Sequence, residues 1–162
     1  KARRSTSRLP PTATSLISAP VTNESDLLPR SPLLIFLLVA ASDGKVDKKE
    51  LANFQKVIIG SGKLNSPLLQ KAIAEMLPNL ERYLLELTSG KFDYIGELKR
   101  IAEYVDKNHA AEAQTFKMSL LGLGKLIAES SGGFFGFGNK MSKEEETALV
   151  AIAVTLGVYP KP

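Results

Sequence analysis

The fold is first evident in L-L-I-F-L-L-V-A-A-S-D-G-K-V-D-K-K-E, residues 33–50. An apolar run opens this stretch, and Ser31-Pro32 ahead of it supplies an N-cap residue and a proline at the first helical position. A short polar turn with glycine follows the run. Asp47 and Glu50 then have the spacing of a capping box, which marks the start of a second helix. The stretch therefore predicts two helices joined by a short turn.

Similar signals recur along the rest of the chain. Apolar residues at helical spacing follow each start signal, and no segment alternates polar and apolar residues with β-branched enrichment. The signals are a start at Ser66-Pro67, a break or kink at Pro78, a cap at Asp93, a long helix over about 110–129, and a capping box from Ser142 to Glu145. We therefore expect an all-α protein that forms a single compact helical bundle of about six to seven helices.

Composition narrows the chemistry that the chain can carry. Its 162 residues fit one domain, and a hydrophobic fraction of 44% is enough for a sizeable core. The absence of cysteine excludes disulfides, iron–sulfur ligation and thiol catalysis, and a single histidine leaves no ligand set for structural zinc. Any metal would be held by oxygen. The longest apolar run is about half of what a membrane span needs, so we expect a soluble protein without a transmembrane segment.

The basic residues gather at the start of the chain. Five of the 21 Lys/Arg and two of the 17 Asp/Glu lie in residues 1–30, which leaves sixteen and fifteen for the rest. A nearly neutral domain does not favour nucleic-acid binding. Residues 1–30 are rich in Ser, Thr, Arg and Pro and are interpreted as a disordered leader, ahead of a domain over 31–159 and a tail over 160–162. The leader also resembles a transit segment, so two locations stay open: the cytoplasm, or a soluble compartment of a plastid or mitochondrion.

The two ends of the domain resemble each other. Residues 37–51 and residues 126–146 each contain an apolar helix, a polar turn with glycine, an apolar residue, a capping box and a second helix. We expect two pseudo-symmetric helical hairpins that pack around a pseudo-twofold axis.

These motifs resemble the TerB-like family, a tellurite-resistance-associated helical domain that is also attached to some DnaJ-type co-chaperones. The resemblance rests on A-S-D-G-K-V-D-K-K-E at residues 41–50, on the degenerate second copy, and on A-I-A-V-T-L-G at residues 151–157. It implies an all-α fold without established enzymatic activity, a link to tellurite and metal stress, and acidic residues that bind divalent cations. In the second copy, Ser131 and Ser142 stand where the family pattern has aspartate.

Asp43, Asp47 and Glu50 are the candidate metal ligands. They match the second half of a calcium loop of the EF-hand kind, but its first and third ligand positions fall on Val39 and Ala41, which cannot coordinate. A full EF-hand is excluded. Two interpretations stay open: a weak oxygen site for a divalent cation such as calcium, or a turn and a helix cap without metal.

The insertion G-G-F-F-G-F-G-N-K at residues 132–140 places three phenylalanines among four glycines. Phe134, Phe135 and Phe137 either fold back to seal the bundle or are presented to a partner protein or a lipid surface, which would make a peripheral membrane contact.

No catalytic constellation stands out. The lone His109 is interpreted as a solvated or helix-capping residue, and neither a nucleophile elbow nor a carboxylate pair accompanies it. We therefore expect a non-enzymatic TerB-like module, linked to tellurite or metal stress, that acts through protein contacts and weak divalent-cation binding. The alternative is a structural or accessory subunit of a larger assembly, which could be organellar.

Overall fold

The computed structural model describes residues 23–40, 46–134 and 141–158, with the side chains of 131–134 left out. Every regular element in these ranges is a helix, which confirms the all-α prediction. Because α3 continues into η1, and α4 into η2 and α5, the described helices form six continuous segments. They are α2 (Glu24–Ala40), α3 (Lys48–Ile59) with η1 (Gly60–Lys63), α4 (Pro67–Met76) with η2 (Leu77–Asn79) and α5 (Leu80–Thr88), α6 (Tyr94–Asn108), α7 (Ala113–Phe134) and α8 (Lys143–Leu156).

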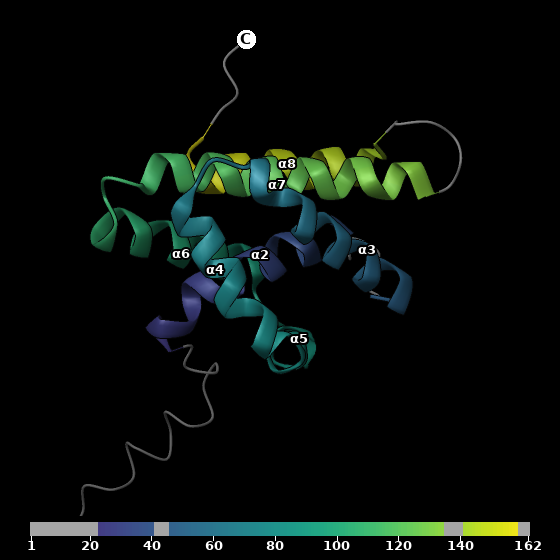
Figure 1. Cartoon of the computed structure of the whole chain (residues 1–162), viewed down its shortest axis with the longest axis horizontal. Coiled ribbons are helices and arrows are strands. Elements are labelled where there is room, and N and C mark those ends of the chain that lie inside the picture. Colours follow the sequence, from purple (N-terminus) through teal and green to yellow (C-terminus); the bar gives the residue numbers. More distant parts are fainter. Residues whose placement is uncertain (1–22, 41–45, 135–140, 159–162) are drawn as a thin grey trace, which may run out of the picture.

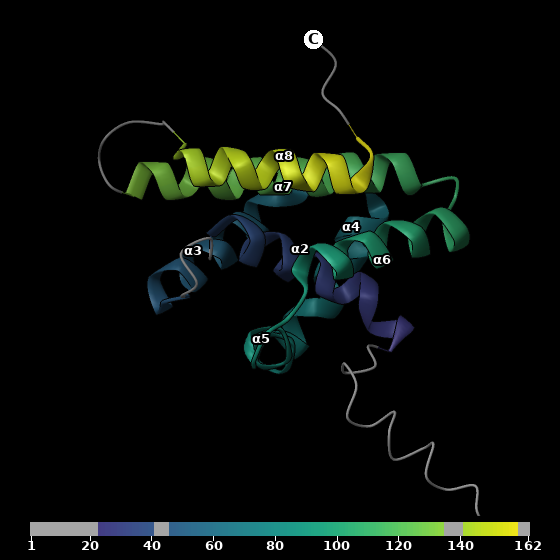
Figure 2. The same ribbon diagram turned by 180° about the vertical axis from the view of Figure 1, so that it is seen from behind.

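Helix α2 is the centre of the bundle. Its residues 29–37 are all buried, and α4, α6, α7 and α8 pack around it (Figure 1). A helix that is apolar on every side is stable in water only when other elements cover it. Helices α7 and α8 form a layer along one side of α2, and α5 lies on the opposite side (Figures 1 and 2). The apolar run in the sequence is therefore the core helix of a globular protein.

Helix α2 begins at Glu24, so the prediction that a disordered leader extends to residue 30 and that Ser31 caps the helix is wrong. Pro29 and Pro32 lie inside the helix. Proline lacks the N–H that would bond a carbonyl one turn earlier. For Pro32 that carbonyl belongs to Leu28, and the hydroxyl of Ser31 donates to it instead at 2.7 Å. Residues 1–22 and 160–162 lie outside the described ranges.

The other start signals are confirmed. Ser66 accepts a hydrogen bond from the N–H of Leu69 at 3.1 Å, and Asp93 caps α6 by accepting from Gly96 at 2.9 Å. The break expected at Pro78 is the 3-10 turn η2. Helix α7 runs over Ala113–Phe134, later at both ends than the predicted range of 110–129.

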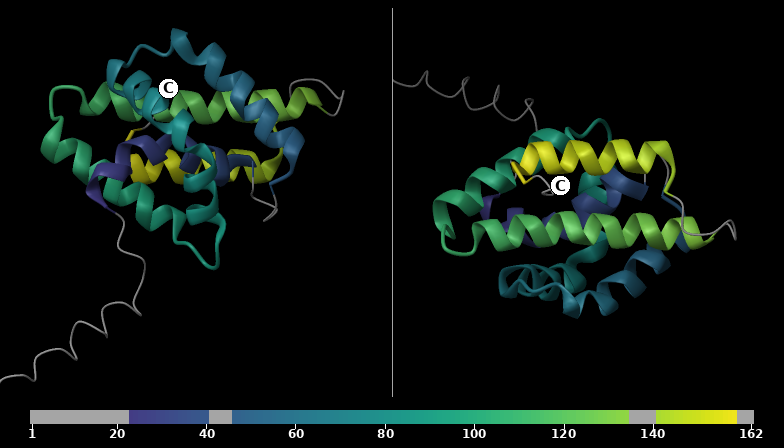
Figure 3. Two further views of the ribbon diagram at one scale, coloured as in Figure 1. Left: turned by 60° about the horizontal axis from the view of Figure 1, so that its bottom comes forward. Right: turned by 90° about the horizontal axis from the view of Figure 1, so that it is seen from above.

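The two predicted hairpins pack in different ways. Helices α7 and α8 run antiparallel and side by side (Figure 3). In the first pair, the rings of Phe36 in α2 and Phe54 in α3 stack with centroids 4.6 Å apart. Helix α3 also packs against α7, where the hydroxyl of Ser130 donates to Oδ1 of Asn53 at 2.8 Å. The relation of the hairpins by a pseudo-twofold axis stays a prediction.

Candidate functional site

The first repeat contains the predicted capping box. The N–H of Glu50 donates to Oδ1 of Asp47 at 2.8 Å, and the N–H of Asp47 donates to Oε2 of Glu50 at 3.0 Å. One oxygen of each carboxylate is therefore used to start α3. Asp43 lies outside the described residues. No group of three His, Asp or Glu side chains within the described ranges is arranged to hold a metal ion. The three-residue cation site stays a prediction.

The second repeat has the same cap with a hydroxyl in place of the aspartate. The N–H of Glu145 donates to the hydroxyl of Ser142 at 3.1 Å, and the N–H of Ser142 donates to Oε2 of Glu145 at 2.9 Å. Phe134 is the last residue of α7 and its side chain is not described, while Phe135 and Phe137 lie outside the described residues. The contact of these three phenylalanines with a partner therefore also stays a prediction.

A cleft of about 420 Å³ lies beside the first repeat. Four helical segments, α2, α3, α5 and α6, contribute to its walls. Its size is in the range of pockets that hold small molecules or single side chains. The apolar lining comes from Leu37, Val46, Leu51, Leu84 and Tyr94, and the exposed residues Asp47, Lys48 and Thr88 line it together with Gly90.

The hydroxyls of two wall residues are bonded within the fold. The hydroxyl of Tyr94 donates to the carbonyl of Leu87 at 2.9 Å, and that of Thr88 donates to the carbonyl of Leu84 at 2.6 Å. Burial raises the pKa of Tyr94, so its hydroxyl stays protonated at neutral pH. Gly90, with φ +75°, supplies the left-handed residue after α5. The cleft therefore presents an apolar wall, and its ionic groups are Asp47 and Lys48.

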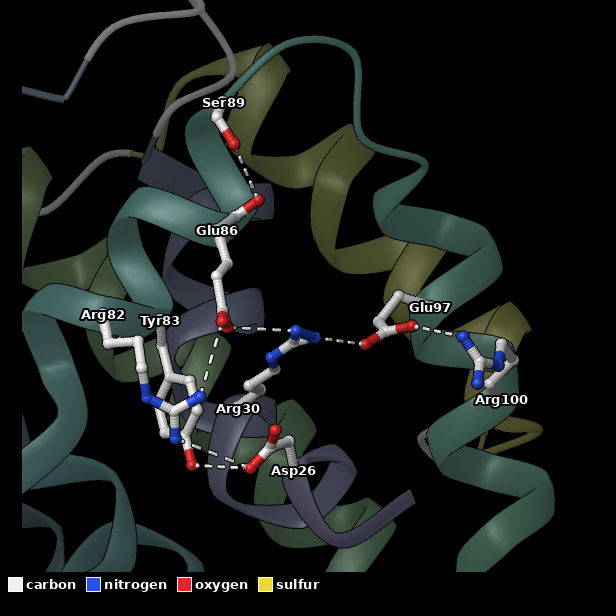
Figure 4. A network of polar contacts seen from close by, with 8 residues as sticks. All are labelled: Asp26, Arg30, Arg82, Tyr83, Glu86, Ser89, Glu97 and Arg100. Carbon is white, nitrogen blue, oxygen red and sulfur yellow. Dashed lines mark hydrogen bonds and ion pairs between the residues drawn. The ribbon is translucent and has the colours of Figure 1, made fainter. Parts of the chain in front are cut away.

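A buried ion network ties three helices together nearer the N-terminus of α2 (Figure 4). The guanidinium of Arg30 in α2 bonds Glu86 of α5 at 3.2 Å and Glu97 of α6 at 3.3 Å. Arg30 is 5% exposed and Glu97 is 3% exposed. Arg100 also bonds Glu97, at 3.2 Å. Buried charges are stable only when they are paired and hydrogen-bonded, and this network pairs them.

The outer part of the network is built on Tyr83. Its hydroxyl donates to Asp26 at 3.2 Å, and the guanidinium of Arg82 lies over its ring, 4.6 Å from the centroid. Burial raises the pKa of Tyr83, and the negative charge of Asp26 raises it further. This network was not predicted from the sequence. The local sequence indicates only pairs such as Arg82 and Glu86, which are four residues apart and so lie on the same face of a helix.

His109 is the C-cap residue of α6, not the start of the long helix. Its backbone N–H donates to the carbonyl of Val105 at 2.8 Å, and its ring is 5.9 Å from that of Tyr104. Because this bond is made by the backbone, a capping role of the imidazole stays a prediction.

Comparison of the chain with family models, with characterised proteins and with solved structures finds no match. The resemblance to the TerB-like family therefore depends on the sequence motifs. None of the helices in the described ranges has the length and hydrophobicity needed to cross a bilayer.

Proposed function

We propose that this chain is a TerB-like helical module that works by binding a partner protein and has no catalytic role. The observation that supports this best is the cleft between α2, α3, α5 and α6. Its apolar walls and its volume of about 420 Å³ suit a large apolar side chain of a partner. Asp47 and Lys48 add one charge of each sign next to the apolar wall, so the same partner can also be held by polar contacts.

Weak binding of a divalent cation is part of the proposal. Asp47 belongs both to the acidic motif and to the cleft, so a cation held by Asp43, Asp47 and Glu50 would act close to the partner. Carboxylate oxygens are the ligands that calcium prefers. A role in tellurite or metal stress follows from the family resemblance, with the cytoplasm as the proposed location.

A cleft-filling substitution tests the partner site. We propose Leu84→Trp, which places a large ring at the cleft wall, and Leu85→Trp as the matched control, because Leu85 is the next residue of α5 and is 70% exposed. Peptides are first selected from a random displayed library on the immobilised wild-type chain, and their affinity is then measured by fluorescence anisotropy. We expect binding to weaken at least about tenfold in Leu84→Trp and to stay unchanged in Leu85→Trp.

Thermal melting of both variants provides the folding control. Peptides that bind Leu84→Trp as tightly as the wild type, or a library from which no peptide is enriched, would contradict a partner site in the cleft.

A second candidate function is that of a structural subunit in a larger assembly. It is favoured by Val150 and Val154, which lie one turn apart on α8 and are 63% and 54% exposed. Exposed apolar side chains that lie together mark contact sites more often than single ones do. Analytical ultracentrifugation of the wild type and of Val154→Lys tests self-assembly through this face, since a wild-type chain that remains monomeric at high concentration would argue against it.

A further inference from the structure

The outer ridge of α3 is exposed and combines basic and apolar residues. Lys48, Ala52, Gln55, Lys56 and Ile59 are all exposed and are spaced so that they follow one side of the helix. Ile59 is 83% exposed, a larger fraction than for any other bulky apolar side chain in the described ranges. On this ridge a bulky apolar side chain, that of Ile59, is exposed to solvent between positively charged lysines.

Acidic residues are missing from most of this segment. Asp47 and Glu50, at the start of α3, are held in the capping box, and residues 51–74 contain no Asp or Glu. The exposed Lys63 continues the positive charge into η1. Lys48, Lys56 and Lys63 form no ion pair with any residue that the structure describes. Lys56 and Lys63 therefore lie in an acid-free part of the segment, while Asp47 and Glu50 keep their negative charge beside Lys48.

The shape of the ridge is convex. Phe54 and Ile58 on the opposite side of α3 are buried in the core, and α3 lies at the edge of the bundle against α7 (Figures 1 and 3). Lys56, Ile59 and Lys63 do not line the cleft beside the first repeat, nor the two smaller clefts next to Glu24. The outer side of a helix can lie flat against a membrane surface.

We propose that α3 and η1 form a contact surface for a membrane with anionic lipid headgroups. Lys48, Lys56 and Lys63 place three exposed basic residues along this surface, and each lysine near an anionic membrane adds to binding. Ile59 enters the boundary between headgroups and acyl chains, while the lysines keep their ammonium groups at the level of the phosphates. This contact goes beyond the proposed partner binding, because Lys56, Ile59 and Lys63 do not line the cleft.

The electrostatic part of the contact sets the size of the expected effect. Each lysine close to an anionic membrane strengthens binding about fivefold, which corresponds to about 1 kcal/mol. The attraction falls off within about one Debye length of the surface, and added salt shortens that length. Removal of two lysines from the ridge should therefore weaken membrane binding about 25-fold. Removal of two lysines elsewhere on the fold should have little effect, although the net charge changes equally.

Vesicle flotation with the full chain tests this contact. We compare phosphatidylcholine vesicles with and without phosphatidylserine, and we compare Lys56→Gln/Lys63→Gln with a control of equal charge, Lys99→Gln/Lys107→Gln on α6. All four lysines are exposed, so thermal melting should be unchanged. We expect binding only with phosphatidylserine, a loss in the α3–η1 variant alone, and a loss in Ile59→Ser that persists when salt is raised.

Equal flotation of the two double variants would overturn the proposal, as would equal binding to vesicles without phosphatidylserine. Binding to a soluble polyglutamate peptide without binding to vesicles would assign the ridge to an acidic protein and would overturn it too. The cleft provides an independent readout, because peptides selected for the cleft should bind Lys56→Gln/Lys63→Gln as they bind the wild type. Failure of one proposal is thereby distinguishable from failure of the other.

Discussion

Replacement of Arg30 by methionine should destabilise the protein more than any other loss of a charge on the network. Methionine retains an apolar stem of similar length but removes the guanidinium, which bonds Glu86 at 3.2 Å and Glu97 at 3.3 Å. The side chain of Glu97 is 2% exposed, so water cannot replace the lost partner. A buried charge that has lost a partner is destabilising because its desolvation is no longer compensated.

The expected loss is about 3 kcal/mol in the free energy of unfolding. This value is the lower end of the range of about 3–5 kcal/mol for breaking a buried pair, because Arg100 still bonds Glu97. For a domain of this size the melting temperature should fall by about 10 °C. In Arg30→Met/Glu97→Gln the buried negative charge is removed as well, so the double variant should lose at least about 1 kcal/mol less than the sum of the single variants.

Urea unfolding followed by circular dichroism measures these losses. Arg82→Met is the matched control, because this guanidinium is half exposed and pairs with Asp26 at 3.7 Å and Glu86 at 3.4 Å on the same network. Water screens such a pair, so its removal should cost far less. The reasoning is refuted if Arg30→Met loses no more stability than Arg82→Met, or if the losses in the double variant are simply additive.

Four further measurements follow from the structure. Phe54→Ala should lower the free energy of unfolding by about 3–5 kcal/mol, because the ring is buried and stacked, and a loss below about 1 kcal/mol would place it outside the core. Gly157→Ala should cost about 1 kcal/mol, since φ is +72° at this helix end, and a gain in stability would contradict that backbone conformation. Burial raises the pKa of Tyr83, so its contribution to stability is complete below a pH of about 10 and is lost as pH rises through the folded pKa. The urea midpoint should therefore fall more steeply with alkaline pH in the wild type than in Tyr83→Phe. Parallel pH profiles of the two proteins would argue against this contribution. Millimolar calcium should raise the melting temperature of the wild type but not that of Asp43→Asn/Glu50→Gln, as expected for a dissociation constant on the order of 10⁻⁴ to 10⁻³ M. An equal rise in both proteins would show that these acids serve only the turn and the cap of α3.

Features that depend on neighbours within one helical turn were predictable from the sequence. The capping boxes at Asp47 and Ser142 and the cap at Ser66 each join a side chain to a backbone group three residues away. The bond and the spacing are both fixed by helix geometry, so the residue types alone indicate them. For the same reason, the 3-10 turn at Pro78 could be expected from a missing N–H.

Features that depend on distant parts of the chain were not predictable. Pro32 was interpreted as the first residue of a helix, although burial of α2 and the bond from Ser31 to a freed carbonyl keep the helix intact across it. Arg30 was counted with the charges of a leader, because its partners lie 56 and 67 residues away. The cleft was missed for the same reason: its walls come from four segments that meet only in the folded chain.

The central place of α2 also determines when the protein can be completed during synthesis. A ribosome makes α2 well before α7 and α8, which cover one side of it. Contacts between such distant segments must wait until both have been made and the chain between them has closed into a loop. Until then the side of α2 that α7 and α8 cover remains an exposed apolar surface, the kind of surface that holdase chaperones bind.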